Sequence, residues 1–327
     1  MGRLVLINSV LDSQLVYIMS SLQLLPGFVK KVDSKRRSFL WSGKDSCSGA
    51  KCLVAWDGVC SDKGEGGLGV TDLMTRNTCL LLKLLHRLFT AMGSSWAGWV
   101  RGRVCLATLT GDLSGDHWTT LRALLPLYRS ITTCLIKDGR STAFWFDAWH
   151  GEDDLSTKFP SLFSHAKKTE VSVREVLETG LAAHLVPRLT PQAVEERDAP
   201  QLVLDDVLLS EAPDVRHCPI AGVGGNLRTG SLYRVMRNGE GVHSAEAAFV
   251  WRNQAPLGYI SLAGLSTTVA SNAALTCPGK KLSKILRVRS VGKPPRTRRT
   301  SSSTAVLLPV SGVLWESRLP RTTATFF

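Results

Sequence analysis

The residues best suited to chemistry are two adjacent carboxylates, Asp205-Asp206, with apolar residues on both sides. Paired aspartates on a strand and turn can help to hold two metal ions about 4 Å apart, as nucleotide addition requires. This pair instead follows a stretch rich in Glu, Arg and Pro at 195–200. A second pair, Asp153-Asp154, comes after Gly151 in a predicted loop. We therefore expect neither pair to be catalytic.

The glycines Gly64, Gly66 and Gly69 formally match the dinucleotide-binding fingerprint, in which glycines let the backbone approach a pyrophosphate. That fingerprint must follow a hydrophobic strand, whereas the preceding stretch 60–63 is mostly polar. The segment 72–91 that follows has helical apolar spacing, so no strand with a ribose-binding acid comes after it. We interpret the glycines as a tight turn into a helix and expect no cofactor.

Three cysteines, Cys47, Cys52 and Cys60, could supply thiolates to a zinc ion. No fourth ligand stands nearby, since His86 falls on the following predicted helix, and reduced, partly buried thiols are the favoured alternative. We predict no metal site. The eight cysteines show no paired framework, and the first apolar run is too interrupted for a secretion signal. These features predict a nuclear or cytoplasmic protein that is not secreted.

Nearly all the excess positive charge lies in the last quarter of the chain. The net charge is +13, yet residues 1–246 hold 28 basic and 26 acidic side chains. Residues 247–327 hold 12 Lys and Arg against one acid. A basic tail of this kind attracts phosphate backbones without recognising sequence. The alternative is a solvated tail with no partner.

The first 22 residues carry apolar side chains every three or four positions, which predicts one stripe of a helix ending at Pro26-Gly27. Residues 4–29 are apolar enough to suggest a membrane span, but Asn8, Asp12 and Gln14 would be costly in lipid. We therefore predict an amphipathic core helix and no membrane partner. The predicted stripe is Leu4, Ile7, Leu11, Leu15, Ile18 and Leu22.

A second helix is predicted over 28–41, with apolar residues on one face and basic residues on the other. The basic face could lie against RNA or DNA, and an ordinary solvated face is the alternative. The candidate nucleic-acid-binding residues are Lys30, Lys31, Lys35, Arg36 and Arg37 here, with Lys280, Lys281, Lys284, Arg287, Arg289, Arg296, Arg298 and Arg299 in the tail.

The remaining elements follow from spacing and turn residues. Thr71 is a good N-cap for a Leu-rich helix, with Asp72 in its first turn. Asp138-Gly139 lies between two β-prone runs and predicts a hairpin. Acids and prolines suggest a loosely ordered connector over 190–215. Further helices are predicted over 94–106, 115–129 and 172–180, with a helix–turn pattern over 228–251 and disorder after about 258.

Several short blocks, in a fixed order, resemble the reverse transcriptase of plant LINE-type (non-LTR) retrotransposons. They cover about residues 2–258 and match the stretch that follows the polymerase core. The first is GRLVLINSVL at 2–11, similar to the family's A-G-R-L-x-L-I-x-S-V-L with Met1 in place of the alanine. The others are Leu25-Pro26, Arg37-x-Phe39-Leu40-Trp41, Val54-Ala55-Trp56, Gly66-Gly67-Leu68-Gly69, Asp138-Gly139, Phe144-Trp145-Phe146-Asp147-Ala148-Trp149, Thr229-Gly230-Ser231-x-Tyr233 and Val250-Trp251-x-x-Gln254-Ala255-Pro256.

The resemblance implies that the catalytic carboxylates and the Y/F-x-D-D hairpin of the polymerase would precede residue 1, so that Met1 is an internal start. Family members continue after the Trp251 block into a zinc-binding module, C-x-x-C…H-x4-C, whereas Cys277 stands alone here. Permitted codons for 287–311 allow much of that module in another frame. This leads to the hypothesis that a frameshift near residue 258 placed the remainder out of frame.

The expected fold is mainly α with small β-hairpins (α+β) and a long disordered C-terminal tail. The chain is expected to be a non-catalytic fragment of a retrotransposon reverse transcriptase-like protein, without a small-molecule substrate. The alternative is an RNA/DNA-binding accessory protein. Possible partners are RNA or DNA and the polymerase part of an intact element. The expected regions are 1–93 (helical, after the thumb), 94–189 (helices and hairpin), 190–215 (linker), 216–258 (start of the zinc-binding region) and 259–327 (basic tail).

Overall fold

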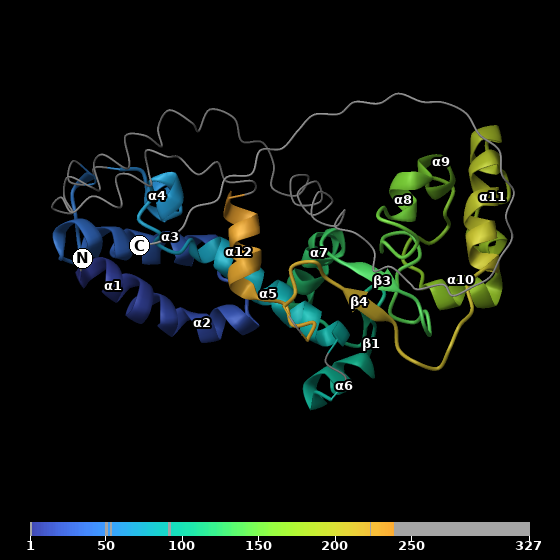
Figure 1. The fold of residues 1–327 in the computed structure, drawn as a ribbon, viewed down its shortest axis with the longest axis horizontal. Coiled ribbons are helices and arrows are strands. Elements are labelled where there is room, and N and C mark those ends of the chain that lie inside the picture. Colours follow the sequence, from blue (N-terminus) through green and yellow to red (C-terminus); the bar gives the residue numbers. More distant parts are fainter. Residues whose placement is uncertain (1, 50–51, 53, 91–92, 223, 239–327) are drawn as a thin grey trace, which may run out of the picture. The chain divides into compact units, whose positions relative to one another are not determined.

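The computed structural model describes residues 2–49, 52, 54–90, 93–222 and 224–238, and the described part is mainly helical (Figure 1). Two antiparallel sheets of two strands each complete it, which confirms the predicted fold class. The predicted tail, 259–327, and the second half of the predicted helix–turn pattern lie outside the described residues.

The N-terminal helical segment contains a wider turn in its middle. An α-helix, α1 (Gly2–Leu6), passes into a π-helix, η1 (Ile7–Leu11), and then into α2 (Asp12–Ser21). A π-helix closes its hydrogen bonds one residue later than an α-helix. Every position after it is therefore shifted by one on the helix surface.

The wider turn changes which side chains face the interior. Ile7, Asp12 and Met19 are fully buried, whereas Leu11 and Ile18 are exposed. The predicted stripe is therefore wrong at Leu11, Ile18 and Leu22, because the inward positions become 12 and 19 in place of 11 and 18. Its Leu15 is confirmed, since this side chain packs against the core that contains Met19.

The next helix, α3 (Pro26–Ser42), begins with proline at its first position and ends at Gly43, whose φ is 70°. Both residues suit these places, since proline has no amide hydrogen to lose at a helix start and glycine accepts positive φ. A short helix, α4 (Trp56–Cys60), and a 3-10 turn, η3 (Lys63–Glu65), follow.

The glycine-rich block forms a turn packed backbone against backbone. Gly66 has a φ of 88°, and a Cβ on Gly67 would lie 2.0 Å from the carbonyl oxygen of Ser61. The amides of Leu68 and Val70 both donate to the carbonyl of Val59. The interpretation of the block as a tight turn is confirmed.

The longest helix, α5 (Leu73–Thr90), packs against α2, α6 (Ser95–Arg101), α7 (Asp116–Ser130) and α12 (Thr229–Asn238). Its first turn corrects one prediction. The cap is Asp72, whose carboxylate accepts from the amide of Thr75 at 3.0 Å, and not Thr71.

The predicted helix over 94–106 ends at Arg101, and a small hairpin takes its second half. Strand β1 (Val104–Cys105) pairs with β2 (Thr110–Gly111). A Cβ on Gly111 would lie 2.2 Å from the carbonyl oxygen of Arg103. Glycine therefore permits the close approach of the two chains.

The hairpin predicted around Asp138-Gly139 is not formed between neighbouring runs. Strand β3 (Thr133–Leu135) pairs instead with β4 (Val215–His217), far along the sequence. The 137–149 segment is held by the side chains of Asp214 and Arg216, which lie far along the sequence and cannot be predicted from the local turn residues.

The connector predicted over 190–215 is mostly a helix. Thr190 caps α11 (Pro191–Asp205) by accepting from the amide of Ala193. Pro191 is compatible with the first turn, and Ala193 and Leu204 are buried against a core around Trp145. Short helices complete this region: α8 (Leu155–Lys158), α9 (Pro160–Phe163), α10 (Val173–Thr179) and the 3-10 turn η4 (Leu181–His184).

Candidate functional site

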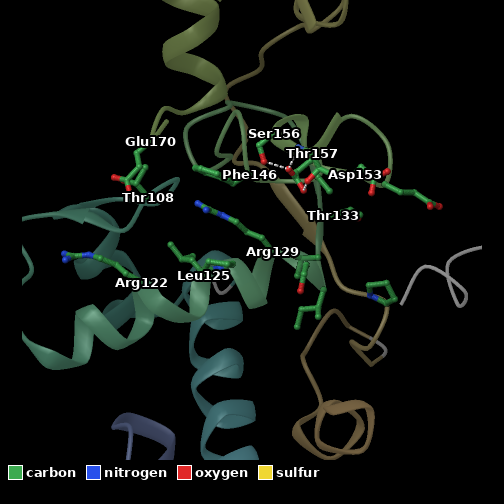
Figure 2. A pocket seen from close by; sticks show the side chains of 18 residues that line it. Thr108, Arg122, Leu125, Arg129, Thr133, Phe146, Asp153, Ser156, Thr157 and Glu170 are labelled. Atoms are coloured by element: carbon green, nitrogen blue, oxygen red, sulfur yellow. Dashed lines mark hydrogen bonds between the residues drawn. The ribbon is translucent and has the colours of Figure 1, made fainter. Parts of the chain in front are cut away.

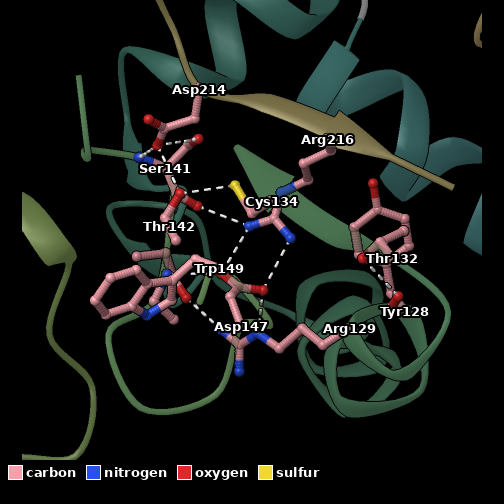
Figure 3. A network of polar contacts seen from close by, with 12 residues as sticks. Tyr128, Arg129, Thr132, Cys134, Ser141, Thr142, Asp147, Trp149, Asp214 and Arg216 are labelled. Atoms are coloured by element: carbon pink, nitrogen blue, oxygen red, sulfur yellow. Dashed lines mark hydrogen bonds and ion pairs between the residues drawn. The ribbon is translucent and has the colours of Figure 1, made fainter. Parts of the chain in front are cut away.

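A buried polar network centres on Arg216 (Figure 3). Strand β4 directs this side chain inward, where its guanidinium lies 4.1 Å from the ring centre of Phe89 and 5.7 Å from that of Tyr128. Nη1 and Nη2 donate to the two carboxylate oxygens of Asp147 at 2.9 and 2.8 Å. Nη2 also donates to the carbonyl of Ser141. A bidentate pair of this kind is strong and fixed in direction.

Asp147 serves two arginines. Its carboxylate also accepts from the amide of Ala143 at 2.6 Å, and the Nε of Arg129 lies 3.4 Å away. Burial lowers the pKa of Arg129, partly offset by Asp147. Burial also disfavours charge on Arg216, but the Asp147 carboxylate outweighs it and raises the pKa of Arg216 above its usual range. Both arginines therefore stay charged beside one carboxylate.

A second carboxylate, Asp214, holds the turn at 137–142. It accepts from the amides of Lys137, Gly139 and Ser141 and from the hydroxyls of Ser141 and Thr142, at 2.7–3.1 Å. Burial alone would raise its pKa, yet these donors together lower it. Gly139 has a φ of 68°, which glycine accepts without strain.

The network explains two of the sequence blocks in structural terms. Asp138-Gly139 and the segment 144–149 are tied to β4 through Asp214 and Arg216. Within the second block, the indole nitrogen of Trp149 donates to the carbonyl of Phe144 at 2.9 Å. The carboxylates of this network are engaged by donors of the chain itself, which suits holding a fold and not proton transfer.

A cavity of about 790 Å³ lies beside this network (Figure 2). Leu125 and Phe146 form part of its apolar lining, and Arg122, Arg129 and Glu170 also line it. Arg122 donates to the carbonyls of Leu109 and Leu113, and Arg129 to that of Ala107. With charges of both signs on an apolar floor, the cavity does not select one class of ligand.

The basic residues predicted on α3 divide into two groups. Lys30, Lys31 and Lys35 are exposed on its outer side. Arg36 is only 1% exposed, so its assignment to the outer face is wrong. Its guanidinium donates to Asp12 at 3.1 Å, to Asp33 at 2.6 Å and to the carbonyl of Thr71 at 2.7 Å. The π-turn supplies the inward Asp12 that draws it into the interior.

Arg37, the last of these residues, is half-buried. Its guanidinium lies over the ring of Trp56, 5.5 Å from the ring centre. The candidate residues of the tail lie outside the described residues: Lys280, Lys281, Lys284, Arg287, Arg289, Arg296, Arg298 and Arg299.

Neither aspartate pair forms part of a metal cluster. Asp205 and Asp206 end α11, where the carboxylate of Asp205 accepts from Gln201. Asp154 caps α8 by accepting from the amide of Thr157. Within the described ranges, no group of three His, Cys, Asp or Glu side chains could hold a metal ion.

The three cysteines considered for zinc do not converge in one open site. Cys47 and Cys52 are half-exposed. Cys60 instead packs with Ile7, Val59, Leu68 and Val70. Burial raises the pKa of the Cys60 thiol to about 12, so it is not a thiolate at neutral pH.

The N-terminal helices carry a group of large apolar side chains that are exposed. Tyr17 and Leu25 are 83% and 74% exposed. The segment Gly2–Ser21 is also long and apolar enough to cross a membrane, judged by length and composition alone. The π-turn, which redirects Leu11 and Ile18, has no signal in apolar spacing. We define the outer apolar face as Val5, Leu6, Val10, Leu11, Tyr17, Ile18, Leu22, Leu25 and Phe28.

The chain is similar to two plant proteins of Arabidopsis thaliana. One is named "Putative ribonuclease H protein"; it is 30% identical over 160 residues, which are 45% of this chain and 25% of that protein. The other is an uncharacterized mitochondrial protein, 29% identical over 142 residues, which are 41% of this chain and 90% of that protein. The match thus spans about a quarter of the first relative. No family model and no solved structure matches the chain.

Proposed function

We propose that this chain is a non-catalytic fragment of a retrotransposon reverse transcriptase-like protein, without polymerase activity of its own. The main support is the similarity to the plant ribonuclease H protein, which is far longer than the matched stretch. Relatives of these two kinds are typical of retroelement-derived sequences. The ordered LINE-type blocks in the same chain point to the stretch after the polymerase core.

The outer apolar face supports a partner for such a fragment. Nine large apolar side chains are exposed within residues 5–28. Groups of exposed large apolar side chains are typical of surfaces that bind a partner. We propose that this face packs against the polymerase part of an intact element.

A membrane is the weaker alternative for this face. To span a bilayer, the segment would have to leave the fold, because Ile7 and Met19 are buried in the interior. That departure would also remove Asp12 from Arg36 and leave a buried guanidinium short of a partner. Breaking a buried ion pair costs about 3–5 kcal/mol.

Primer extension tests the absence of activity. The purified chain is given a primed RNA template, deoxynucleotides and Mg²⁺, and no template-dependent product is expected. Asp206→Asn is the matched variant. Extension by the native chain that this variant abolishes would overturn the proposal.

Co-purification with the polymerase part of an intact plant element tests the partner. The native chain is expected to bind it, and a Tyr17→Ser/Ile18→Ser variant is expected to lose that binding. Leu202→Ser is the control, because Leu202 is exposed on α11, outside the outer apolar face. Equal retention of all three chains would exclude the face as the contact.

An RNA/DNA-binding accessory protein is the second candidate function. It is favoured by the three exposed lysines on α3, Lys30, Lys31 and Lys35, together with the basic tail. Binding should weaken steeply with salt, since phosphate contacts release counterions. It should weaken again on deletion of 280–299, and binding that ignores this deletion would remove the tail from the interface.

A further inference from the structure

A polar groove on α3 combines basic and hydroxyl side chains with two carboxylates. It is a cavity of about 460 Å³ between α3 and the start of α4. We call it the α3 groove and define it by Lys30, Asp33, Ser34, Arg37, Trp56 and Asp57.

Three of these residues can face one ligand. Lys30, Ser34 and Arg37 are spaced i, i+4 and i+7, so they follow one stripe of the helix. At about 1.5 Å of rise per residue, the stripe is about 10 Å long. It combines an ammonium, a hydroxyl and a guanidinium, which are groups that bind phosphate oxygens.

Arg37 is held in place without being neutralised. Its guanidinium lies over the Trp56 ring, and its buried Nε has no hydrogen-bond partner. No carboxylate of the described residues forms an ion pair with it, in contrast to its neighbour Arg36. A stacked arginine loses less side-chain freedom when it binds a phosphate.

The two acids of the groove oppose an anion only in part. Asp33 is engaged by Nη1 of Arg36 at 2.6 Å, and burial raises its pKa, so its negative charge is partly offset. Asp57 stands exposed at the rim. Lys31 and Lys35, exposed on the same helix, add positive charge around the groove.

We infer that the α3 groove binds the phosphodiester backbone of a single-stranded nucleic acid, with Lys30, Ser34 and Arg37 as its contacts. This inference rests on the second candidate function and assigns it a site. The stripe is long enough to contact two successive phosphates of one strand. The guanidiniums of Arg36 and Arg37 both already lie over the Trp56 ring, each 5.5 Å from its centre, so we assign the groove to the backbone and not to a stacked base.

Binding of a labelled oligodeoxythymidine to the full chain, measured over a series of salt concentrations, tests the site. The Lys30→Gln/Arg37→Gln variant is expected to bind about tenfold more weakly. Its slope of log affinity against log salt should be smaller by about 1 to 2, one for each lost phosphate contact. Lys167→Gln is the control, because Lys167 is an exposed lysine outside the groove.

Binding of inorganic pyrophosphate, measured by calorimetry, distinguishes a failure of the α3 groove as the site from a failure of nucleic-acid binding as the function. If the oligonucleotide binds the double variant as tightly as the native chain, the groove is excluded while nucleic-acid binding stands. If pyrophosphate binds through Lys30 and Arg37 but the oligonucleotide does not bind, the backbone assignment and the nucleic-acid function both fail. Arg37→Lys keeps the positive charge and serves as the control for a folding defect. If this variant folds but binds as weakly as Arg37→Gln, a phosphate contact by this side chain is contradicted.

Discussion

Two buried arginines, Arg36 and Arg216, are both compensated by carboxylates, but the ratio of acidic to basic groups differs between the two clusters. Arg36 meets two carboxylates, Asp12 and Asp33, through one hydrogen bond each. Arg216 shares one carboxylate, Asp147, with a second arginine and binds it through two hydrogen bonds. The first cluster has an excess of acid and the second an excess of base.

The difference matters because the carboxylates of the Arg36 cluster can become neutral by taking up a proton, whereas an arginine cannot become neutral by losing one. Burial raises the pKa of both Asp12 and Asp33, so each takes up a proton more readily in the folded chain. A guanidinium does not lose its proton in proteins. The Arg36 cluster can therefore adjust to the loss of a charge, whereas the Arg216 cluster depends on its bidentate geometry.

The largest effect is expected for Arg216→Met. The variant leaves the Asp147 carboxylate, which is 1% exposed, without its bidentate partner. The free energy of unfolding should fall by about 3–5 kcal/mol. Urea unfolding at neutral pH measures it, with Arg197→Met, at an exposed pair, as the control expected to cost under about 1 kcal/mol. A loss as small as that of the control would contradict the role given to Arg216.

Arg36→Met sharpens the comparison, because its cost should depend on pH. At neutral pH two carboxylates lose their cation, and we expect a loss of about 3 kcal/mol, at the lower end for a buried pair because Asp33 is partly exposed. A carboxyl with a raised folded-state pKa stabilises the fold most below its ordinary value of 3.8, and this contribution is lost as pH rises through the folded pKa. The cost should therefore shrink toward acidic pH. A cost that is constant between neutral pH and pH near 4 would break the contrast.

Asp214 should respond to acid in the opposite sense. Its pKa is lowered by the donors of the 137–142 turn, so its contribution is present above 3.8 and is lost as pH falls through the folded pKa. Asp214→Asn should cost about 2 kcal/mol at neutral pH, since several hydrogen bonds to a charged group weaken. That cost should vanish in strong acid, as measured by urea midpoints of both chains across pH. A cost that survives full protonation would point to packing and not to charge.

Gly139→Ala should have the smallest effect of the four. A Cβ there would lie 3.0 Å from the amide nitrogen of Arg174, in a backbone with φ of 68°. We expect a loss of about 1–2 kcal/mol. Gly98→Ala is the matched control, since Gly98 lies in α6 with nothing within 4 Å of the added carbon, and it should be neutral or slightly stabilising. Thermal unfolding of the two variants gives the comparison directly.

The elements set by local signals were predictable from the sequence. The Leu-rich spacing gives α5, the run at 115–129 gives α7, and the glycine block gives its tight turn. The elements set by distant partners were not. β3 finds its partner 80 residues later, at β4, because Asp214 and Arg216 hold the intervening turn.

The candidate site shows the same limit. Exposure of Lys30, Lys31 and Lys35 follows from helical spacing, but the burial of Arg36 depends on Asp12, which faces inward only because of the π-turn. The contribution of Trp56 to the α3 groove depends on a loop that returns α4 to α3. Neither the one-residue shift caused by a π-turn nor the contact of Trp56 with α3 can be predicted from the periodicity of apolar residues.

The π-turn at Ile7–Leu11 also limits what can be learned from the isolated segment. A synthetic peptide of residues 2–21 would lack Arg36, and therefore the ion pair with Asp12 that stabilises the wider turn. It could therefore form a regular α-helix, whose polar and apolar faces would differ from those of the same segment in the intact chain. Solubility, detergent affinity or aggregation measured on that peptide would therefore describe a different object from the segment it was cut from.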